Sequence, residues 1–229
     1  MKKLVIVPAY NESGNILKTI NDIKDNAPGF DYIIVNDCST DNTLEIIKEN
    51  GFEYLDLPVN LGIGGAVQAG YRYALNKDYD MAVQFDGDGQ HNAKYLENMA
   101  SRLVETESDM VIGSRFIEHE GFQSSGIRRI GIKFFTGLIK LLTGKKITDP
   151  TSGLRIVNKN LIKLFALDYP KDYPEPESEV QILSKGYKVC EVPVVMNERE
   201  EGTSSISMIN GVYYMIKVSV AIVIAKLNK

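Results

Sequence analysis

The sequence predicts an α/β protein with a mostly parallel sheet flanked by helices. Short, β-branched apolar runs alternate with longer segments whose apolar residues recur every three or four positions. The links between these segments are short, and strands joined through helices run parallel and are covered on both faces. The chain has 229 residues, which is the length of one large domain.

The predicted elements follow in order along the chain. Apolar runs bounded by polar residues, Gly or Pro predict strands at residues 4–7, 32–35, 52–55, 81–85, 110–112 and 189–195. Three- and four-residue apolar spacing predicts helices at residues 15–25, 43–50, 63–75, 93–105 and 177–185. In open α/β sheets ligands bind beyond the carboxyl ends of the strands, so we expect the functional residues there.

Beyond residue 113 the pattern changes to a basic, amphipathic helix. One stripe of residues 127–142 is apolar and consists of Ile127, Ile130, Phe134, Phe135, Leu138, Ile139 and Leu142. The cations that flank it are Arg128, Arg129, Lys133 and Lys140. Residues 127–163 hold nine Lys or Arg against one acid. Two interpretations stay open: a helix that faces the core, or an interfacial helix that meets anionic lipid headgroups.

The last long apolar stretch covers residues 208–227. Asn210, Gly211 and Lys217 interrupt it, so we expect no bilayer span. It is interpreted either as a helix at a membrane surface or as an oligomer contact. The predicted organisation is a catalytic domain at residues 1–205 followed by a C-terminal apolar helix at residues 206–229.

Composition narrows the classes of function. Twenty-six Lys and Arg against thirty Asp and Glu give a net charge of −4, which does not favour nucleic acid as a partner. The only cysteines, Cys38 and Cys190, are far apart and fit a reducing compartment, and two histidines argue against structural zinc. Only four apolar residues separate Lys3 from Pro8, which is too short for a secretory signal. We expect a cytoplasmic protein, peripherally associated with the inner face of the cell membrane.

Acids and glycines gather where the predicted strands end. The first strand runs into residues 8–12, the second into residues 36–41 and the fourth into residues 86–91. A Gly-rich turn at residues 60–66 opens the third helix, where a helix N-terminus would face anionic phosphates. The convergence of these loops at one edge of the sheet predicts a nucleotide site.

Asp86 and Asp88 are the sharpest local signal. Two carboxylates on alternate positions of a turn can hold a hard divalent cation, which prefers oxygen ligands and bridges diphosphate oxygens. Gln90 adds another oxygen. After the second strand, we interpret Asp37 as functional and Asp41 as the cap of the following helix.

These blocks together resemble the family 2 glycosyltransferases with the GT-A (Rossmann-like) fold, in particular the polyprenyl-phosphate glycosyltransferases of the dolichyl-phosphate mannosyltransferase type. Residues 8–12, 36–41 and 86–90 match the opening, second-strand and metal motifs. Residues 113–116 and 148–155 match two later blocks. All five stand in the family's order over roughly residues 3 to 205.

The resemblance implies a role for particular residues. The implied nucleotide-sugar site consists of Pro8, Ala9, Tyr10, Glu12, Asp37, Gly65, Asp86 and Arg199. The implied ligands of Mg²⁺ or Mn²⁺ are Asp86, Asp88 and Gln90. The implied contacts of a polyprenyl phosphate acceptor are Arg115, Arg129, Lys133 and Ser152. Asp88, Arg115 and Arg129 are the implied catalytic residues, and Arg199 belongs to a late loop that closes over the diphosphate in the family.

Two departures from the family pattern bear on the substrates. The second-strand motif usually reads Asp-Asp-Gly-Ser and here reads Asn36-Asp37-Cys38-Ser39, which leaves the base open. Members that build polysaccharides usually carry a Glu-Asp pair and a Gln-x-x-Arg-Trp motif, and this chain has no Trp and no Glu-Asp pair. A sugar hydroxyl needs a general base, whereas a phosphate monoester is already anionic and needs mainly positioning and charge neutralisation. The prediction is inverting, metal-dependent transfer of a hexose from a nucleotide diphosphate sugar, UDP-sugar favoured, to a polyprenyl phosphate.

Alternatives remain open at this point. Transfer to a saccharide in cell-wall or capsule synthesis would need a base near residues 175–179, although Glu175 and Glu177 also suit the first turn of a helix. A non-catalytic partner that binds nucleotide sugar is a second alternative. Relatives often add transmembrane helices after this region, so the resemblance implies a separate small membrane protein as partner. A homo-oligomer through the C-terminal helix also stays open.

Overall fold

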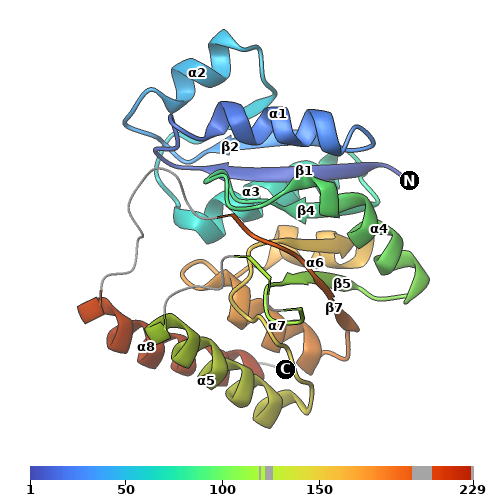
Figure 1. Cartoon of the computed structure of the whole chain (residues 1–229), viewed down its shortest axis with the longest axis vertical. Coiled ribbons are helices and arrows are strands. Elements are labelled where there is room, and N and C mark those ends of the chain that lie inside the picture. The colour runs from blue at the N-terminus through green and yellow to red at the C-terminus, as the bar shows by residue number, and fades with distance from the viewer. Residues whose placement is uncertain (119, 122–125, 198–207, 228–229) are drawn as a thin grey trace.

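A seven-stranded mixed sheet forms the centre of the molecule. The computed structural model describes residues 1–118, 120–121, 126–197 and 208–227 (Figure 1). The strands are β1 (Lys3–Ala9), β2 (Asp31–Asn36), β3 (Tyr54–Asp56), β4 (Met81–Gln84), β5 (Met110–Ser114), β6 (Arg155–Asn158) and β7 (Val189–Pro193). Their order is β3-β2-β1-β4-β6-β5-β7. The predicted strands are confirmed, with β3 beginning two residues later than expected.

Strand β6 is the element of the sheet that the sequence did not predict. It runs antiparallel to both of its neighbours, β4 and β5, whereas the other pairings are parallel. The strand is four residues long and begins with Arg155, so it lacks the apolar run that predicts a buried strand. Asn158 then ends the strand and caps the next helix by accepting hydrogen bonds from the amides of Asn160 and Leu161.

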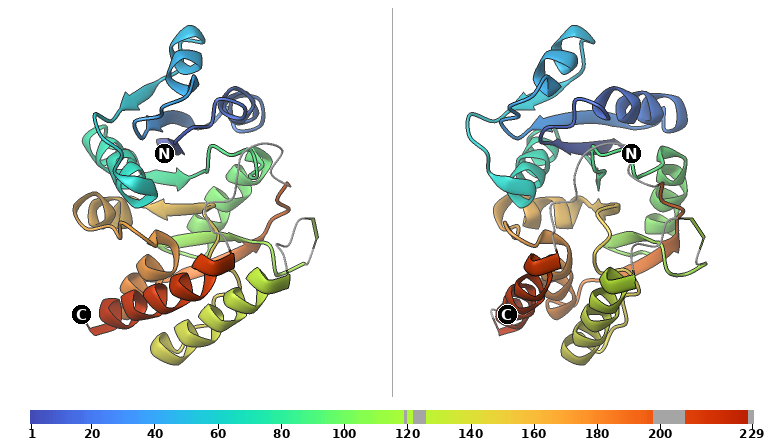
Figure 2. Two further views of the ribbon diagram at one scale, coloured as in Figure 1. Left: turned by 90° about the vertical axis from the view of Figure 1, so that its left-hand side faces the viewer. Right: turned by 60° about the vertical axis from the view of Figure 1, so that its left-hand side comes forward.

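Helices cover both faces of the sheet. Their bounds are α1 (Ile16–Asn26), α2 (Thr43–Glu49), α3 (Gly62–Asn76), α4 (Leu96–Glu105), α5 (Gly126–Thr143), α6 (Lys159–Leu167), α7 (Pro174–Ser184) and α8 (Met208–Leu227). A 3-10 turn, Ala93–Tyr95, leads into α4. Helix α6 was not predicted, and α7 begins three residues earlier than expected. Helices α5 and α8 lie side by side at the end of the molecule away from β1 and β2 (Figures 1 and 2).

The core has two halves, one on each face of the sheet. Alternate residues of β1 belong to different halves: Leu4 and Ile6 to the cluster that includes residues of α3, α6 and α8, and Val5 and Val7 to the cluster that includes residues of α1, α2 and α4. This alternation within an almost fully buried strand confirms the expected sheet covered on both faces.

The apolar stripe predicted for residues 127–142 is divided in the structure. Phe135 and Ile139 are buried in the core. Ile130 and Phe134 are 68% and 47% exposed, so the residues predicted to form one stripe do not share one environment. Helical geometry puts the two ridges on adjacent faces of α5, and contact with α7 and α8 covers only one of them. Each of the two interpretations therefore applies to a different ridge of the same helix.

Helix α8 is apolar on its inner and its outer side. Val218 and Ile222 are buried, whereas the outer side exposes Ile216, Val220, Val223, Ile224 and Leu227. No helix in the described part of the chain is long and apolar enough to cross a bilayer. The outer sides of α5 and α8 thus form an exposed apolar surface at one end of the molecule.

Candidate functional site

The loops that follow β1 and β2 are joined into one surface by hydrogen bonds. The amide of Asn11 donates to Ser39 Oγ at 3.0 Å, and the amide of Thr40 donates to Asn11 Oδ1 at 2.8 Å. The amide of Glu12 donates to the hydroxyl of Thr43 at 2.9 Å. These contacts hold the two loops at the same edge of the sheet, as predicted for a nucleotide site.

The first-strand candidates differ in what they can offer. Pro8 and Ala9 are buried in the sheet, where they pair with β2, so only their backbone lies near the edge. Tyr10 is 48% exposed and Glu12 is half-buried, so these two side chains can meet a ligand.

Asp41 lies one residue before the N-cap of α2, which is Asn42, so its predicted position as the cap is wrong by one residue. Its Oδ1 accepts hydrogen bonds from the amide and the hydroxyl of Thr43, and its Oδ2 accepts one from the amide of Ser13 at 3.2 Å. Burial raises the pKa of Asp41, but these hydrogen bonds outweigh burial and hold the pKa below its usual value. Asp41 therefore fastens the two loops together and binds the first residue of α2.

Asp37 anchors the turn that opens α3. It is 3% exposed, and its Oδ1 accepts a hydrogen bond from the amide of Leu61 at 2.7 Å. Asn60 donates from its side chain to the carbonyl of Asp37. Gly65 lies directly over Leu61, because a Cβ added at residue 65 would come within 2.4 Å of the Leu61 Cβ. Asp37 thus has a structural contact besides the nucleotide contact that the resemblance implies.

Cys38 adopts a backbone conformation that favours glycine. Its φ is +59°, at the position where the family motif usually has Gly. We expect Cys38→Gly to stabilise the protein by about 0.5 kcal/mol, because relief of left-handed strain exceeds the entropic cost of glycine. Thermal unfolding of the two proteins measures this difference, and a lower melting temperature for the variant would contradict it.

The turn after β4 presents the predicted metal ligands. Asp86 is 32% exposed in its side chain, and its Oδ2 lies 3.2 Å from His91 Nε2. Its Oδ1 accepts a hydrogen bond from Gln84 at 3.3 Å. Burial raises the pKa of Asp86, but the hydrogen bonds from His91 and Gln84 outweigh burial and lower it. An ionised carboxylate at this place is what a cation requires.

Asp88 and Gln90 belong to the same turn. The amide of Gln90 donates to Asp88 Oδ1 at 3.1 Å, and the side-chain amide nitrogen of Gln90 donates to the carbonyl of Asn197 at 3.4 Å. Asp86, Asp88 and Gln90 supply oxygen donors only, which fits Mg²⁺ or Mn²⁺. Among the described residues no three His, Cys, Asp or Glu side chains converge as a metal site, so these ligands would form part of a coordination shell. Arg199 lies outside the described residues.

Two contacts of Asp86 were not predicted from the sequence. The first is with Glu175, at the start of α7, and it runs through Gln84. The side-chain amide of Gln84, which donates to Asp86, also donates to Glu175 Oε1 at 3.2 Å. Burial raises the pKa of Glu175 above its usual value, against the opposing effect of Arg155. On the other side, a Cβ added at Gly153 would come within 2.3 Å of Asp86 Oδ2. The carboxylate of Asp86 therefore rests on the backbone of the 148–155 segment.

Arg155 is a fully buried hub that holds α7 next to this segment. It forms an ion pair with Glu179 at 2.7 Å, with both side chains at most 1% exposed. It also donates to the carbonyls of Ser152 and Glu175. Burial raises the pKa of Glu179, against the opposing charge of Arg155. Among Glu175, Glu177 and Glu179 of α7, Glu175 is the acid that is linked to Asp86 through Gln84.

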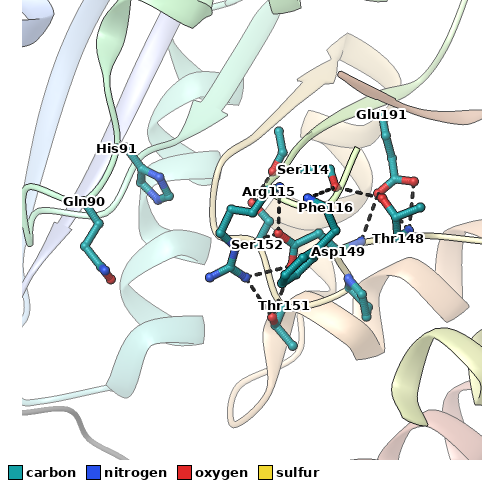
Figure 3. Close-up of polar contacts among 12 residues, drawn as sticks. Gln90, His91, Ser114, Arg115, Phe116, Thr148, Asp149, Thr151, Ser152 and Glu191 are labelled. Carbon is teal, nitrogen blue, oxygen red and sulfur yellow. Dashed lines mark hydrogen bonds and ion pairs between the residues drawn. The ribbon is translucent and has the colours of Figure 1, made fainter. Parts of the chain in front are cut away.

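Arg115 is held by a buried acid. Its Nε and Nη2 each donate to Asp149 at 2.7 Å, and Nη2 also donates to Thr151 (Figure 3). Asp149 is fully buried, so the ion pair braces the 148–155 segment against β5. Ser152 is 1% exposed, and its hydroxyl donates to the carbonyl of Gly113 at 2.6 Å. The side chain of Ser152 is thus engaged within the protein.

A basic cavity lies between α5 and this segment. Its volume is about 240 Å³, and its lining consists of Phe116, Arg129, Ile132, Lys133, Thr136, Lys146 and Thr148. The structure therefore brings Arg129 and Lys133 together, as the resemblance implies, and adds Lys146, which the motif analysis did not assign. The basic composition of residues 127–163 was the available signal for it.

Comparison with known proteins agrees with the motifs. The model of the glycosyl transferase family 2 matches residues 4–165. The undecaprenyl-phosphate mannosyltransferase of Micrococcus luteus is 30% identical, over 90% of this chain and 88% of the relative. The UDP-N-acetylglucosamine–dolichyl-phosphate N-acetylglucosaminyltransferase of Methanococcus voltae is 30% identical, over 83% of each chain.

The fold has solved counterparts. Glucosyl-3-phosphoglycerate synthase from Mycobacterium tuberculosis, solved with Mn²⁺, UDP-glucose and phosphoglyceric acid, gives a TM-score of 0.73 at 18% identity, over 98% of this chain and 79% of that one. The predicted family and fold are thereby confirmed. The chain belongs to glycosyl transferase family 2, a family of enzymes, and has the GT-A fold.

Proposed function

We propose that this glycosyltransferase moves a hexose from a nucleotide diphosphate sugar to a polyprenyl phosphate, with inversion and with a divalent metal. The observation that carries the proposal is the basic cavity beside the 148–155 segment. Its lining holds three cations and no acid. Such a cavity suits an anionic acceptor, which needs charge neutralisation and positioning more than it needs a base. The names of the Micrococcus and Methanococcus relatives, which include lipid phosphates, support this acceptor class.

The donor would lie across the carboxyl ends of β1, β2 and β4. Tyr10 and Glu12 offer exposed or half-exposed side chains for the base and ribose, and Asp37 has Oδ2 for the same purpose. Asp86, Asp88 and Gln90 would hold Mg²⁺ or Mn²⁺ against the diphosphate. UDP is the favoured nucleotide, because one relative is named for UDP-N-acetylglucosamine.

The reaction is a single displacement. An oxygen of the acceptor phosphate attacks the anomeric carbon, the bond from that carbon to the diphosphate breaks, and the nucleoside diphosphate leaves with the electron pair. When bound, the metal would neutralise the charge that develops on the leaving diphosphate. Arg129 and Lys133 hold the acceptor phosphate, and Arg115 keeps the cavity wall in place through Asp149. Attack from the face opposite the leaving group inverts the anomeric centre.

The exposed sides of α5 and α8 would face the inner surface of the cell membrane. Ile130 and Phe134 on α5 and Ile224 on α8 expose apolar side chains, and Arg129 and Lys133 of the cavity lining belong to α5 as well. Apolar insertion combined with Lys and Arg is how interfacial helices bind anionic membranes. The other partners that would fit this surface are a small membrane protein and a second copy of the chain.

Charges on this surface should release the protein from membranes. We expect the double variant Phe134→Asp, Ile224→Asp to bind phosphatidylglycerol vesicles at least tenfold more weakly, because two apolar side chains no longer insert. Co-sedimentation measures the binding. Val104→Asp is the control, since Val104 is 48% exposed on α4, which packs on the opposite half of the core. Unchanged vesicle binding would contradict the proposal, and loss of a dimer instead would favour the oligomer contact.

Transfer to a saccharide is the second candidate, and the position of Glu175 favours it. Hydrogen bonds from the side chain of Gln84 link this carboxyl to that of Asp86. The raised pKa of Glu175 suits a general base. Glu175→Gln discriminates between the candidates. With a phosphate acceptor we expect kcat to stay within about tenfold of the wild type, whereas loss of a base would lower it by about 10²–10⁴-fold. The pH profile adds a check, because a base would lose activity as the pH falls through its raised pKa.

Release of nucleoside diphosphate tests the function as a whole. Purified protein is incubated with Mn²⁺ and a panel of nucleotide sugars, with and without undecaprenyl phosphate in detergent. Release that depends on the lipid would support the proposal and identify the donor. Release that instead depends on a saccharide would overturn it. No release with either acceptor from a protein that binds the nucleotide sugar would also count against it.

A further inference from the structure

The cavity that would receive the acceptor carries more positive charge than the family motif assigns. Arg129 and Lys133 enter it from α5, and Lys146 enters it from the segment that follows α5. Within the described part of the chain, none of the ion pairs involves any of these three side chains. Three cations that face one small volume repel one another, so an anion bound there would be stabilised.

Two acids in contact with the segment that holds Thr148 are already engaged. Asp149 is bound by Arg115 through two hydrogen bonds of 2.7 Å. Glu191 accepts hydrogen bonds from the amide and hydroxyl of Thr148 and from the amide of Asp149, at 2.8–3.0 Å. Figure 3 shows both acids turned toward these partners. Neither carboxylate compensates the cations of the cavity.

The backbone on both sides of Lys146 is fixed. Gly144 ends α5 with a φ of +73°, and its amide donates to the carbonyl of Lys140. Ile147 is 3% exposed in the core, and Thr148 is tied to Glu191. Lys146 therefore lines the cavity from a short backbone segment that is anchored at each end, which lowers the entropy cost of ordering this residue around a bound anion.

We propose that Lys146 is a third cation of the acceptor site and favours a phosphate monoester over acceptors of lower charge. A phosphate monoester carries about −1.5 to −2 charges at neutral pH. Two cations only match this charge, and solvent screens them because Arg129 and Lys133 are exposed, so a third cation adds attraction. The inference rests on the proposed function, because it names a further residue of that acceptor site. It concerns the affinity for the acceptor and leaves binding of the donor unchanged.

The test compares two adjacent lysines. Lys146→Ala, Lys146→Arg and Lys145→Ala are assayed with a saturating donor and a water-soluble, short-chain isoprenyl phosphate, which avoids effects of membrane binding. Lys145 and Lys146 are both exposed, but only Lys146 lines the cavity, so Lys145 is the matched control. We expect Lys146→Ala to raise the KM for the isoprenyl phosphate about tenfold, a value typical for loss of one charge-assisted contact. Lys146→Arg should keep the KM for the isoprenyl phosphate close to the wild-type value, and Lys145→Ala should leave it unchanged.

The outcomes separate this inference from the proposed function. Equal KM values for Lys146→Ala and Lys145→Ala, with lipid-dependent turnover intact, would overturn the role of Lys146 alone. A parallel rise in the KM for the nucleotide sugar would overturn it too, since that would indicate a disturbed fold. Absence of turnover with any phosphate acceptor in the wild type would overturn the proposed function itself. Thermal melting of each variant shows whether the fold is retained.

Discussion

Asp88→Ala should lower kcat for sugar transfer by about 10³-fold while the protein stays folded. Asp88 stands on the turn after β4, half-buried, where its Oδ1 accepts a hydrogen bond from the amide of Gln90. Loss of this carboxylate would remove a proposed metal ligand and, if the proposal holds, several kcal/mol of stabilisation of the departing diphosphate. Steady-state kinetics over a series of Mn²⁺ concentrations measures the loss, and circular dichroism confirms the fold.

A surface acid provides the control for this experiment. Asp25→Ala removes a carboxylate from the exposed end of α1 and should leave both kcat and the Mn²⁺ dependence unchanged. If Asp88→Ala kept the wild-type rate and the wild-type Mn²⁺ dependence, the metal assignment would be wrong. If it lost activity at low Mn²⁺ and recovered at high Mn²⁺, the assignment would stand with a weaker effect on chemistry.

Local pattern predicted the parallel half of the sheet and the loops at its edge. Strands β1, β2 and β4 are runs of apolar residues, and the polar loops after them follow directly along the chain. The apolar run and the polar loop after it lie within a few residues of each other, so both can be recognised in the sequence. Strand β6 is different, because its first residue is the buried Arg155, whose partner Glu179 lies 24 positions away. A charge paired over that distance has no local signature.

The same limit applies to the candidate site. The motifs pointed to Asp86 and Arg115 but could not reveal what each of them touches. Arg115 is paired with Asp149, which is 34 residues away, and Asp86 is linked to Glu175 through Gln84. These contacts depend on how β5, β6 and α7 are placed against one another. They add a structural contact of Arg115, as a brace of the cavity wall, to the phosphate contact that the resemblance implies.

The structure also connects the two halves of the proposed reaction through one segment. Residue 148 lines the cavity for the acceptor, residue 149 holds Arg115, and Gly153 lies against Asp86. The acceptor wall and a proposed metal ligand are thus parts of the same short stretch of backbone. Substitutions between residues 148 and 153 should therefore affect donor and acceptor kinetics together.

Gly153→Ala should weaken binding of Mn²⁺ in the presence of UDP by about 100-fold. The added Cβ would lie 2.3 Å from Asp86 Oδ2 and 2.9 Å from its Cγ, far inside van der Waals contact. The glycine backbone cannot retreat easily, because Ser152 is tied to Gly113 and the carbonyl of Leu154 accepts from the Gly113 amide at 2.9 Å. The carboxylate must move instead, away from the place where it would coordinate the metal.

A second glycine separates this effect from the general effect of adding a methyl group. Gly137 is exposed on α5 and a Cβ there meets nothing within 4 Å, so Gly137→Ala should stabilise the protein by up to about 1 kcal/mol and leave Mn²⁺ binding unchanged. Calorimetric titration of Mn²⁺ into the protein with UDP, beside a melting curve for each variant, makes the comparison. A folded Gly153→Ala protein with wild-type Mn²⁺ affinity would show that Asp86 does not bind the metal. A folded protein with weakened affinity, normal UDP binding without metal and loss of transfer would place the carboxylate of Asp86 at the metal, because the steric change reaches the site through that side chain.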